Sequence, residues 1–239
     1  WKGLESPLGT PAIRTGMRLA VRASAEPRRR KSKRAVTRDV LDRLIATCQT
    51  DRLADTRDLA ILLVAFGSGG RRHSEVARLR LEQLTVEPDV LLDPDDKDSP
   101  RLPCMAIALG RTKNTQADDD ARVLLIGAPV TALREWIERA DVKKGAVFRA
   151  IDQWEAINDR ALTPQAINLI LKRRCAMAGL DPVEFSAHGL RSGYLTEAAR
   201  NGVALPAAMR QSQHRSVQQA ARYYNDADQA LGKAARLAV

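Results

Sequence analysis

Aromatic residues and long apolar runs are both scarce in this chain of 239 residues. Phe, Trp and Tyr together make up only 4%, which argues against a general RNA-binding module with aromatic side chains interleaved among basic ones. No stretch approaches the roughly 18 consecutive apolar residues of a membrane span. The longest apolar stretch, residues 59–66, is typical of a buried helix. We therefore expect neither a membrane span nor a secretory signal peptide.

Cysteine is also rare, and the few that occur do not suggest a disulfide framework. Cys48, Cys104 and Cys175 lie far apart, and an odd number cannot all pair within one chain. The three histidines show no metal-ligand spacing with them. A glycine-rich nucleotide-binding loop and a carboxylate-rich metal site are missing as well. We predict reduced thiols, a cytoplasmic protein, and no metal or other cofactor.

Positive charge is abundant. The formal net charge is +10, the sequence pI is about 10.0, and hydrophobic residues make up 44%, which is enough for a substantial core. This balance favours a polyanionic partner, most often nucleic acid. Ribosome-like, RNA-binding and membrane-surface proteins share the same property, so the charge alone does not choose among them.

Much of the positive charge gathers in residues 27–35, which have no apolar periodicity and read as a basic linker. The segment is either a solvated charge run or a strap that lies on phosphates and contributes affinity without sequence readout. We favour the strap. Its basic residues are Arg28, Arg29, Arg30, Lys31, Lys33 and Arg34.

Periodicity predicts a mostly α fold with a small antiparallel β-sheet, the α+β class. Thr37 and Thr163 read as helix N-caps, the second followed by proline at the first helical position. Residues 102–109 and 122–126 read as the strands of a hairpin, and the acidic, proline-containing residues 87–100 as a loop. Two-stranded hairpins are marginal alone, so we expect a third strand or helix packing. The remaining helices are predicted at residues 11–25, 55–66, 72–81, 130–140, 188–201, 205–211 and 216–223.

His188 and Arg191 are the first pair with chemical potential. On a helix, positions i and i+3 face the same way, so an imidazole and a guanidinium lie side by side near the helix N-terminus. A helix N-terminus itself favours anions, and a phosphate fits there. Such a spacing is common, and a surface helix without function is the alternative interpretation.

Arg72 and Glu75 form a second i, i+3 pair, just after a buried helix that stops at a run of glycines. The glutamate can hold the arginine's guanidinium group in place and leave some of its N–H donors free for phosphate. An ordinary surface ion pair is the alternative. Arg71 adjoins Arg72, so a shift of one residue is also open. Ser74 and Glu75, which follow, favour Arg72.

A third element completes a known pattern, because His214 is followed nine residues later by Tyr223. In this order the elements resemble the signature of the tyrosine recombinases, or phage-type integrases. A lysine on a β-hairpin is a fourth family element, and Lys113 lies in the predicted turn. The sequence departs from the family at Gln213, where glycine is usual. The boxes are Arg72-His73-Ser74-Glu75, His188-Gly189-Leu190-Arg191-Ser192-Gly193, and His214 with Tyr223.

The resemblance implies a nucleophilic tyrosine. Tyr223 would attack a DNA phosphodiester to give a 3′-phosphotyrosine and a free 5′-hydroxyl, without ATP or metal. Its free pKa is about 10, so a neighbouring base or cationic field must help it ionise. The spacing from His214 selects Tyr223 over the adjacent Tyr224.

The other site residues would bind and protonate. Arg72 and Arg191 would grip the non-bridging oxygens, with Glu75 orienting Arg72. His214 and His188 would add hydrogen bonds or move protons. Lys113 would act as general acid for the departing 5′-oxygen. Lys97 is the alternative lysine, although pairing with the acidic residues around it is the simpler account.

The same resemblance implies the organisation of the chain and its partners. Residues 1–26 are expected to be the last helix of an N-terminal DNA-clamping domain, 27–35 the linker, 36–225 the catalytic domain, and 226–239 a tail helix exchanged between subunits. The partner would be double-stranded DNA, bound as a homo-tetramer by a chain that is monomeric when free. A bacterial, phage or mobile-element origin would fit.

Two other functions remain open at this stage. A type IB topoisomerase shares the chemistry but relaxes DNA instead of recombining it. A DNA-binding protein with a decayed recombinase fold is the second, and the completeness of the residue set argues against it.

Overall fold

The computed structural model describes residues 10–23, 32–109, 121–214 and 216–231. The chain divides into two compact units, Trp1–Lys31 and Ser32–Val239. The first unit contains α1 (Pro11–Ala23), on which Ile13 and Met17 are exposed. Both share the helix side that the periodicity predicted as apolar. The division falls inside the predicted basic linker, so Ser32 and the residues after it belong to the second unit.

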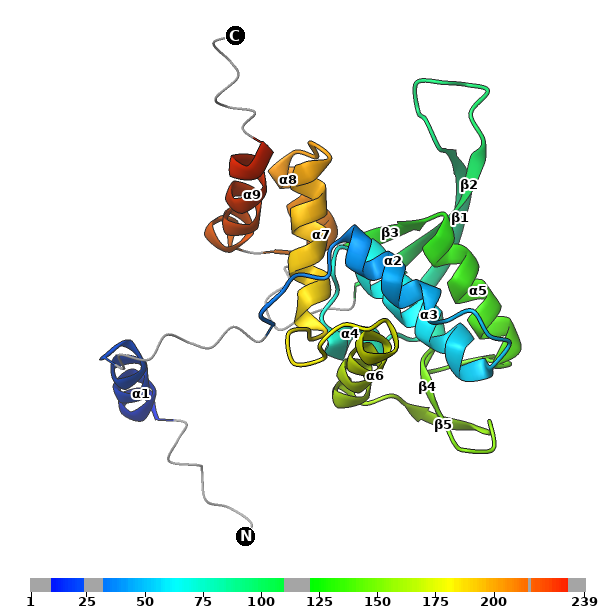
Figure 1. The fold of residues 1–239 in the computed structure, drawn as a ribbon, viewed down its shortest axis with the longest axis horizontal. Coiled ribbons are helices and arrows are strands. Elements are labelled where there is room, and N and C mark those ends of the chain that lie inside the picture. Colours follow the sequence, from blue (N-terminus) through cyan, green and yellow to red (C-terminus); the bar gives the residue numbers. More distant parts are fainter. Residues whose placement is uncertain (1–9, 24–31, 110–120, 215, 232–239) are drawn as a thin grey trace. The chain divides into compact units, whose positions relative to one another are not determined.

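The second unit is mostly helical with short antiparallel strands, which confirms the predicted α+β class. Figure 1 shows α3 and α5 next to the three-stranded sheet, α2 and α6 packed near α3, and α7, α8 and α9 grouped together. The elements are α2 (Arg38–Ala46), α3 (Leu53–Gly67), α4 (His73–Ala77), the 3-10 helix η2 (Leu81–Gln83), β1 (Leu84–Leu91), β2 (Arg101–Ala108), β3 (Arg122–Ile126), α5 (Ala128–Arg139), β4 (Arg149–Ile151), β5 (Ile157–Ala161), α6 (Pro164–Met177), α7 (His188–Arg200), α8 (Leu205–Ser212) and α9 (Val217–Leu231).

The sheet has the order β1-β2-β3, so the expected third strand exists and is β1. The prediction of a loop from residue 87 was wrong for the end of this strand, which runs to Leu91. Pro88 is the reason that the sequence favoured a loop here, because proline is rare inside a strand. The register of β1 against β2 shifts between Glu87 and Val90, and β1 is an edge strand. An edge or a bulge is where a residue without an N–H is tolerated in a sheet.

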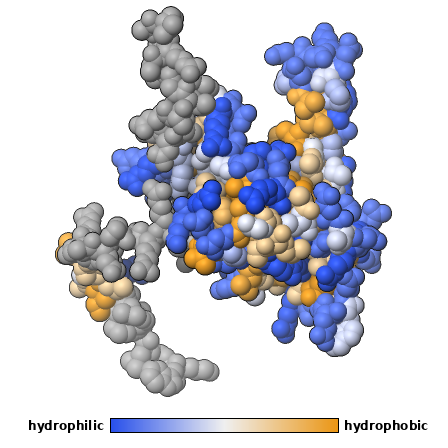
Figure 2. Space-filling model, in the orientation of Figure 1, coloured by the Kyte–Doolittle hydropathy of each residue, from blue (hydrophilic) through white to orange (hydrophobic). Residues whose placement is uncertain are grey.

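The turn between β1 and β2 carries the acidic residues around Lys97. Asp93 and Asp96 accept hydrogen bonds from backbone N–H groups two residues further on, which shapes the turn. The turn projects away from α4 and α7 in Figure 1, and Figure 2 shows it as a hydrophilic tip. Lys97 joins none of the ion pairs among the described residues, so the expected pairing with its acidic neighbours is not observed.

A second, two-stranded sheet of β4 and β5 was not predicted. Its strands are short and only partly buried, so they show no alternation of apolar and polar residues. Asp152 shapes the turn by accepting hydrogen bonds from the backbone N–H groups of Trp154 and Ala156, at 2.8 and 2.9 Å. Local turn chemistry and strand pairing therefore define this ribbon, while the hydrophobic pattern does not reveal it.

Two hydrophobic clusters form the core of the second unit. The larger lies among α2, α3, α5, α6 and the three-stranded sheet, and Trp136 at its centre donates from Nε1 to the carbonyl of Val147 at 2.8 Å. The smaller joins α7, α8 and α9 through Leu195, Ala208 and Ala220. Because α7 contributes Leu190 to the first cluster and Leu195 to the second, it connects the two parts of the unit.

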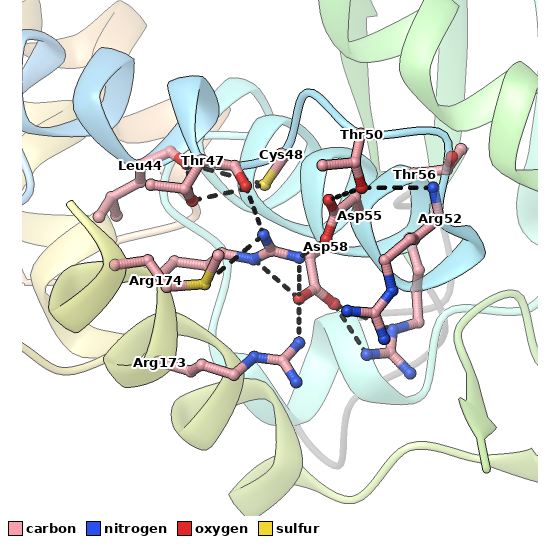
Figure 3. Close-up of polar contacts among 12 residues, drawn as sticks. Leu44, Thr47, Cys48, Thr50, Arg52, Asp55, Thr56, Asp58, Arg173 and Arg174 are labelled. Atoms are coloured by element: carbon pink, nitrogen blue, oxygen red, sulfur yellow. Dashed lines mark hydrogen bonds and ion pairs between the residues drawn. The ribbon is translucent and has the colours of Figure 1, made fainter. Parts of the chain in front are cut away.

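A buried ion cluster ties α6 to α3 and to the end of α2 (Figure 3). Asp58 is fully buried and accepts from Arg57, Arg173 and Arg174. Arg174 also donates to Asp55 at 2.6 Å and to the carbonyl of Thr47 at 2.7 Å. Since every charge in the cluster has an opposite charge beside it, burial is tolerated. The cluster fixes the position of α6 against α3 and the end of α2.

Helix α9 differs from the predicted helix over residues 216–223. It continues without a break to Leu231, so residues 226–231 extend the helix that carries Tyr223 and do not start a separate tail helix. No helix in the described ranges is long and apolar enough to cross a membrane.

Candidate active site

A glycine turn after α3 brings the site's elements together. Gly69 and Gly70 both have positive φ angles, 87° and 69°, which favour glycine. A Cβ on Gly70 would lie 2.3 Å from the Cα of Arg191, and one on Gly69 would lie 2.4 Å from the carbonyl oxygen of Gln211. The turn therefore touches the backbones of α7 and α8 at once. The glycines do more than stop α3, because they allow this close approach.

Arg191 is buried where the glycine turn meets α7 and α8, and it has hydrogen-bond partners in the turn and at the end of α8. Its Nη1 donates to the carbonyl of Ser212 at 2.6 Å and to that of Gly70 at 3.3 Å, and its Nε donates to Nε2 of His214 at 3.1 Å. No described residue accepts a hydrogen bond from Nη2. Burial, and after it the charge of Arg72, lower the pKa of Arg191 to about 10. The guanidinium remains cationic at neutral pH.

His214 is held as a neutral imidazole. Because Nε2 accepts from Arg191, the ring proton lies on Nδ1, which donates to the Ser212 hydroxyl at 2.8 Å. Burial lowers the pKa of His214 to about 4, and the charges of Arg191, Arg72 and His188 add to that effect. In this state Nε2 has no proton to give, so the histidine acts as an acceptor until a bound anion offsets the surrounding positive charge.

Arg72 and Glu75 lie as the sequence predicted, at the start of α4. Nη1 of Arg72 is 3.6 Å from Oε1 of Glu75, and the Arg72 backbone N–H donates to Oε2 at 3.3 Å. Nη1 of Arg71 also approaches Oε2, at 3.4 Å. The side chain of Arg72 is 65% exposed while that of Arg71 is 11% exposed. Of the two candidates, Arg72 is the one that a ligand from solvent can reach.

The two neighbouring tyrosines differ sharply. Tyr224 is buried in the smaller cluster, and its hydroxyl donates to the carbonyl of Val203 at 3.1 Å. Tyr223 is half-buried at the edge of that cluster, and it lies in electrostatic range of the Arg191 guanidinium. The geometry therefore supports the choice of Tyr223 over Tyr224.

The other predicted site residues either lie outside the described residues or have partners of their own. Lys113 and Arg28, Arg29, Arg30 and Lys31 lie outside the described residues. Arg34 already has partners, because Nη1 lies 3.3 Å from the Glu184 carboxylate and the guanidinium lies 5.5 Å over the Phe185 ring. Lys33 is exposed, and its backbone N–H donates to the Glu184 carbonyl. The end of the linker is thus docked onto the loop before α7.

Two contributors were missed in the sequence. Ser212 positions both Arg191 and His214, and Arg71 shares Glu75 with Arg72. A serine two residues before a histidine carries no signal, since the contact needs the backbone reversal at Gln213, which has a φ of 54°. Arg71 was noted only as an alternative to Arg72.

Together these side chains present far more positive than negative charge in a partly buried space. The charges of Arg71 and Arg72 act on Arg191, with the Glu75 carboxylate opposing them, and the charges of Arg191, Arg72 and His188 act on His214. Guanidinium forks match the oxygens of a phosphate. The site therefore has the positive charge and the hydrogen-bond donors that suit a phosphate group.

Residues 34–230 match the model of the phage integrase family, and the chain belongs to that family. It is 26% identical over 229 residues to an integrase/recombinase XerD homolog of Selenomonas ruminantium, covering 93% of this chain and 62% of the relative. It is 28% identical over 174 residues to the tyrosine recombinase XerD of Xanthomonas axonopodis pv. citri, covering 73% of this chain and 52% of that protein. The chain thus spans roughly half to three fifths of the length of these relatives.

A solved structure has the same fold. The XerH site-specific recombinase bound to a palindromic difH substrate superposes with a TM-score of 0.63 at 19% identity, covering 87% of this chain and 54% of that one. This similarity shows the fold. The family match over residues 34–230 confirms the family that the sequence motifs indicated.

Proposed function

We propose that the chain is the catalytic part of a site-specific DNA recombinase that cuts and rejoins strands through Tyr223. The observation that carries this proposal is the grouping of Arg72, Arg191 and His214, which interact with one another, with Tyr223 in electrostatic range of Arg191. The family's relatives, named as recombinases, support the same reaction.

The reaction would be a transesterification at phosphorus. The Tyr223 oxygen attacks the phosphorus of a DNA phosphodiester, the bond from phosphorus to the 5′-oxygen breaks, and a 3′-phosphotyrosine forms. The phenol proton leaves to a base or to water, and the departing 5′-oxygen takes up a proton. Arg72 and Arg191 stabilise the charge that develops on the non-bridging oxygens. A second 5′-hydroxyl reverses these steps, so the energy of the bond is kept.

His214 would change from an acceptor to a donor in this scheme. Its neutral Nε2 is held by Arg191 in the free site, and a bound phosphate would draw the Arg191 guanidinium toward its own oxygens. The phosphate's charge would also favour the imidazolium. His214 would then donate to a non-bridging oxygen, which the free state does not allow. His188 at the N-terminus of α7 would bind the same phosphate from the other side.

Lys113 is proposed as the general acid for the 5′-oxygen. Its ammonium group holds a proton at neutral pH, and it follows β2, which pairs with β3 across the expected hairpin. A Lys113→Ala variant should cleave slowly, and a 5′-bridging sulfur, which leaves without a proton, should restore the rate. Failure of that rescue, or the same behaviour in Lys97→Ala, would move the role elsewhere.

The decisive experiment uses a pool of duplexes with a randomised segment around a nick. After cleavage the short strand diffuses away, and the covalent complex accumulates. Adducts that survive denaturation are recovered, the peptide is mapped and the DNA is sequenced, which also gives the target site. A phosphotyrosine at residue 223 is expected. If a protein that binds these duplexes yields no adduct, it is a DNA-binding member of the family without the cleavage activity.

Recombination and relaxation are separated by a second measurement. Two duplexes carrying the selected site are mixed, and exchanged products are sought along with relaxation of a supercoiled plasmid. We expect exchange. Relaxation without exchange would instead support a topoisomerase.

The remaining proposals concern partners and assembly. The linker residues from Arg28 to Arg34 would lie on phosphates, and residues 1–26 would belong to a DNA-clamping domain. Residues beyond Leu231 would dock on a neighbouring copy in a tetramer on DNA. A bacterial, phage or mobile-element origin is in keeping with relatives from bacteria.

A further inference from the structure

Arg71 is an unusual residue in the second unit, because its cationic side chain is almost fully buried and only partly bonded. Nη1 contacts Glu75 at 3.4 Å, while Nε and Nη2 are buried and have no hydrogen-bond partner in the described part of the chain. Nε and Nη2 form one edge of the guanidinium, so a complete two-pronged donor edge is unsatisfied. Burial without partners is costly, which calls for a compensating role.

The partner that Arg71 does have is informative. Oε2 of Glu75 receives both Nη1 of Arg71 and the backbone N–H of Arg72, while Oε1 faces Nη1 of Arg72 at 3.6 Å. One carboxylate thus lies between two guanidinium groups. Arg71 approaches from the buried side and Arg72 from the exposed side, where ligand enters.

This arrangement determines how much of Arg72's charge is available to a ligand. If Arg72 were the only cation beside Glu75, the carboxylate would neutralise it, and moving Arg72 toward a phosphate would leave Glu75 unpaired. Arg71 supplies a permanent counter-charge on the other side. Arg72 can then leave Glu75, and the charge of Arg71 is still felt in the site, since it helps to lower the pKa of Arg191.

We propose that Arg71 is a positioning residue for strand cleavage, which neutralises Glu75 from the buried side and so frees Arg72 for the scissile phosphate. The inference rests on the proposed cleavage activity. During attack by a tyrosinate, the phosphate group passes from one negative charge to two. Arg71, Arg72 and Arg191 against Glu75 leave two net positive charges to meet it, and loss of Arg71 leaves one.

The test compares Arg71→Met with wild type. Methionine fills the buried path of the side chain without unsatisfied donors, so the melting temperature should hold or rise. The rate of adduct formation at saturating selected duplex should fall about tenfold or more, whereas affinity for the intact duplex stays within about twofold. Arg80→Met removes an exposed arginine paired with Glu82 and is the matched control, expected to behave as wild type.

A double variant separates positioning from packing. Adding Glu75→Gln to Arg71→Met removes the carboxylate that would otherwise neutralise Arg72, so the adduct rate should rise above that of Arg71→Met alone. A packing role predicts no such recovery. Arg71→Lys, which keeps the charge, should retain more activity than Arg71→Met.

The outcomes are distinct. An unchanged rate in Arg71→Met, or a joint fall in rate and melting temperature without recovery by Glu75→Gln, overturns the role of Arg71. If wild type itself forms no adduct, the proposed activity fails first, and the Arg71 comparison then has no rate to explain.

Discussion

Single residues in the site take their properties from burial and from their immediate neighbours. Arg191 and His214 share a hydrogen bond, and both have lowered pKa values because burial and nearby cations disfavour a further positive charge. The adjacent Tyr223 and Tyr224 differ in burial, because successive residues on α9 face different directions.

The tyrosines give the first prediction. Tyr223→Phe should abolish the covalent adduct and leave duplex binding intact, because only the attacking oxygen is lost. Tyr224→Phe should still form the adduct but lower the free energy of unfolding by about 1 kcal/mol, because the buried hydrogen bond to Val203 disappears. Denaturation and adduct mapping check both. An adduct at Tyr224 would refute the assignment.

His214 predicts a pH dependence of stability. Its folded pKa of about 4 is below the usual histidine value of 6.5, so protonation favours the unfolded chain between these two values. The contribution is complete above pH 6.5 and is lost as the pH falls toward 4. Allowing for partial exposure of the ring, we expect a loss of about 1–2 kcal/mol over that window.

The matched variant is His214→Gln, which can still accept from Arg191 and donate to Ser212 but cannot titrate. Urea unfolding at a series of pH values should show a shallower dependence for His214→Gln than for wild type between pH 4 and 6.5. Identical slopes would mean that another group carries the effect.

At the scale of elements, close backbone contacts hold the catalytic helix in place. The end of the linker and Val36, which follows it, cross the N-terminal half of α7, where the backbone N–H of Val36 donates to the Gly189 carbonyl at 2.8 Å. A Cβ on Gly193 would lie 1.8 Å from the Val36 carbonyl oxygen. The proposed catalytic residues His188 and Arg191 lie on the same helix as Gly189 and Gly193, so this segment contacts the helix that carries part of the candidate site.

Gly193→Ala is therefore predicted to destabilise the protein, although the same substitution usually stabilises a helix. In a helix interior alanine is normally better than glycine by about 1 kcal/mol. Here the methyl group must displace the linker, so we expect destabilisation of about 1–3 kcal/mol together with a slower adduct rate. Thr196→Ala, three residues further along α7, is the control for a change of helix propensity. A stabilised Gly193→Ala variant would show that the linker yields without cost.

The whole molecule raises the question of what α9 and the residues after it do in an assembly. An open pocket of about 460 Å³ beside His214 has an apolar lining that includes Leu205, Met209 and Val217. A short segment is marginal as an isolated helix and needs a surface to pack on. The tail of a second copy would fill the pocket and connect neighbouring sites in a ring, which closes only if the rotation permits.

Deleting residues 229–239 should leave binding to a single site nearly intact and weaken cooperative assembly and strand exchange. Val217→Asp places a charge at the exposed rim of the pocket and should have the same effect from the accepting side. Sedimentation of protein on duplexes with one and two sites measures assembly. If both variants assemble and recombine as wild type does, the tail packs only within its own subunit.

Local sequence was sufficient for the α+β class, most of the helices and the β2–β3 pairing, because apolar periodicity, the cap at Thr163 and glycine stops act over a few residues. It was insufficient for β4 and β5, whose partly buried strands lack a pattern, and for the end of β1, where a bulge accommodates Pro88. Local sequence also predicted that the last helix ends at residue 223, whereas α9 continues to Leu231.

The sequence by itself determined which residue types carry the chemistry, since Arg72, His188, Arg191, His214 and Tyr223 stand at spacings that a single family signature explains. Only the tertiary structure decided their states. The neutral imidazole of His214, the exposure of Arg72 against the burial of Arg71, and the roles of Ser212 and the glycine turn all depend on segments far apart in the chain. Burial and charge act through space, and their effects cannot be read along the chain.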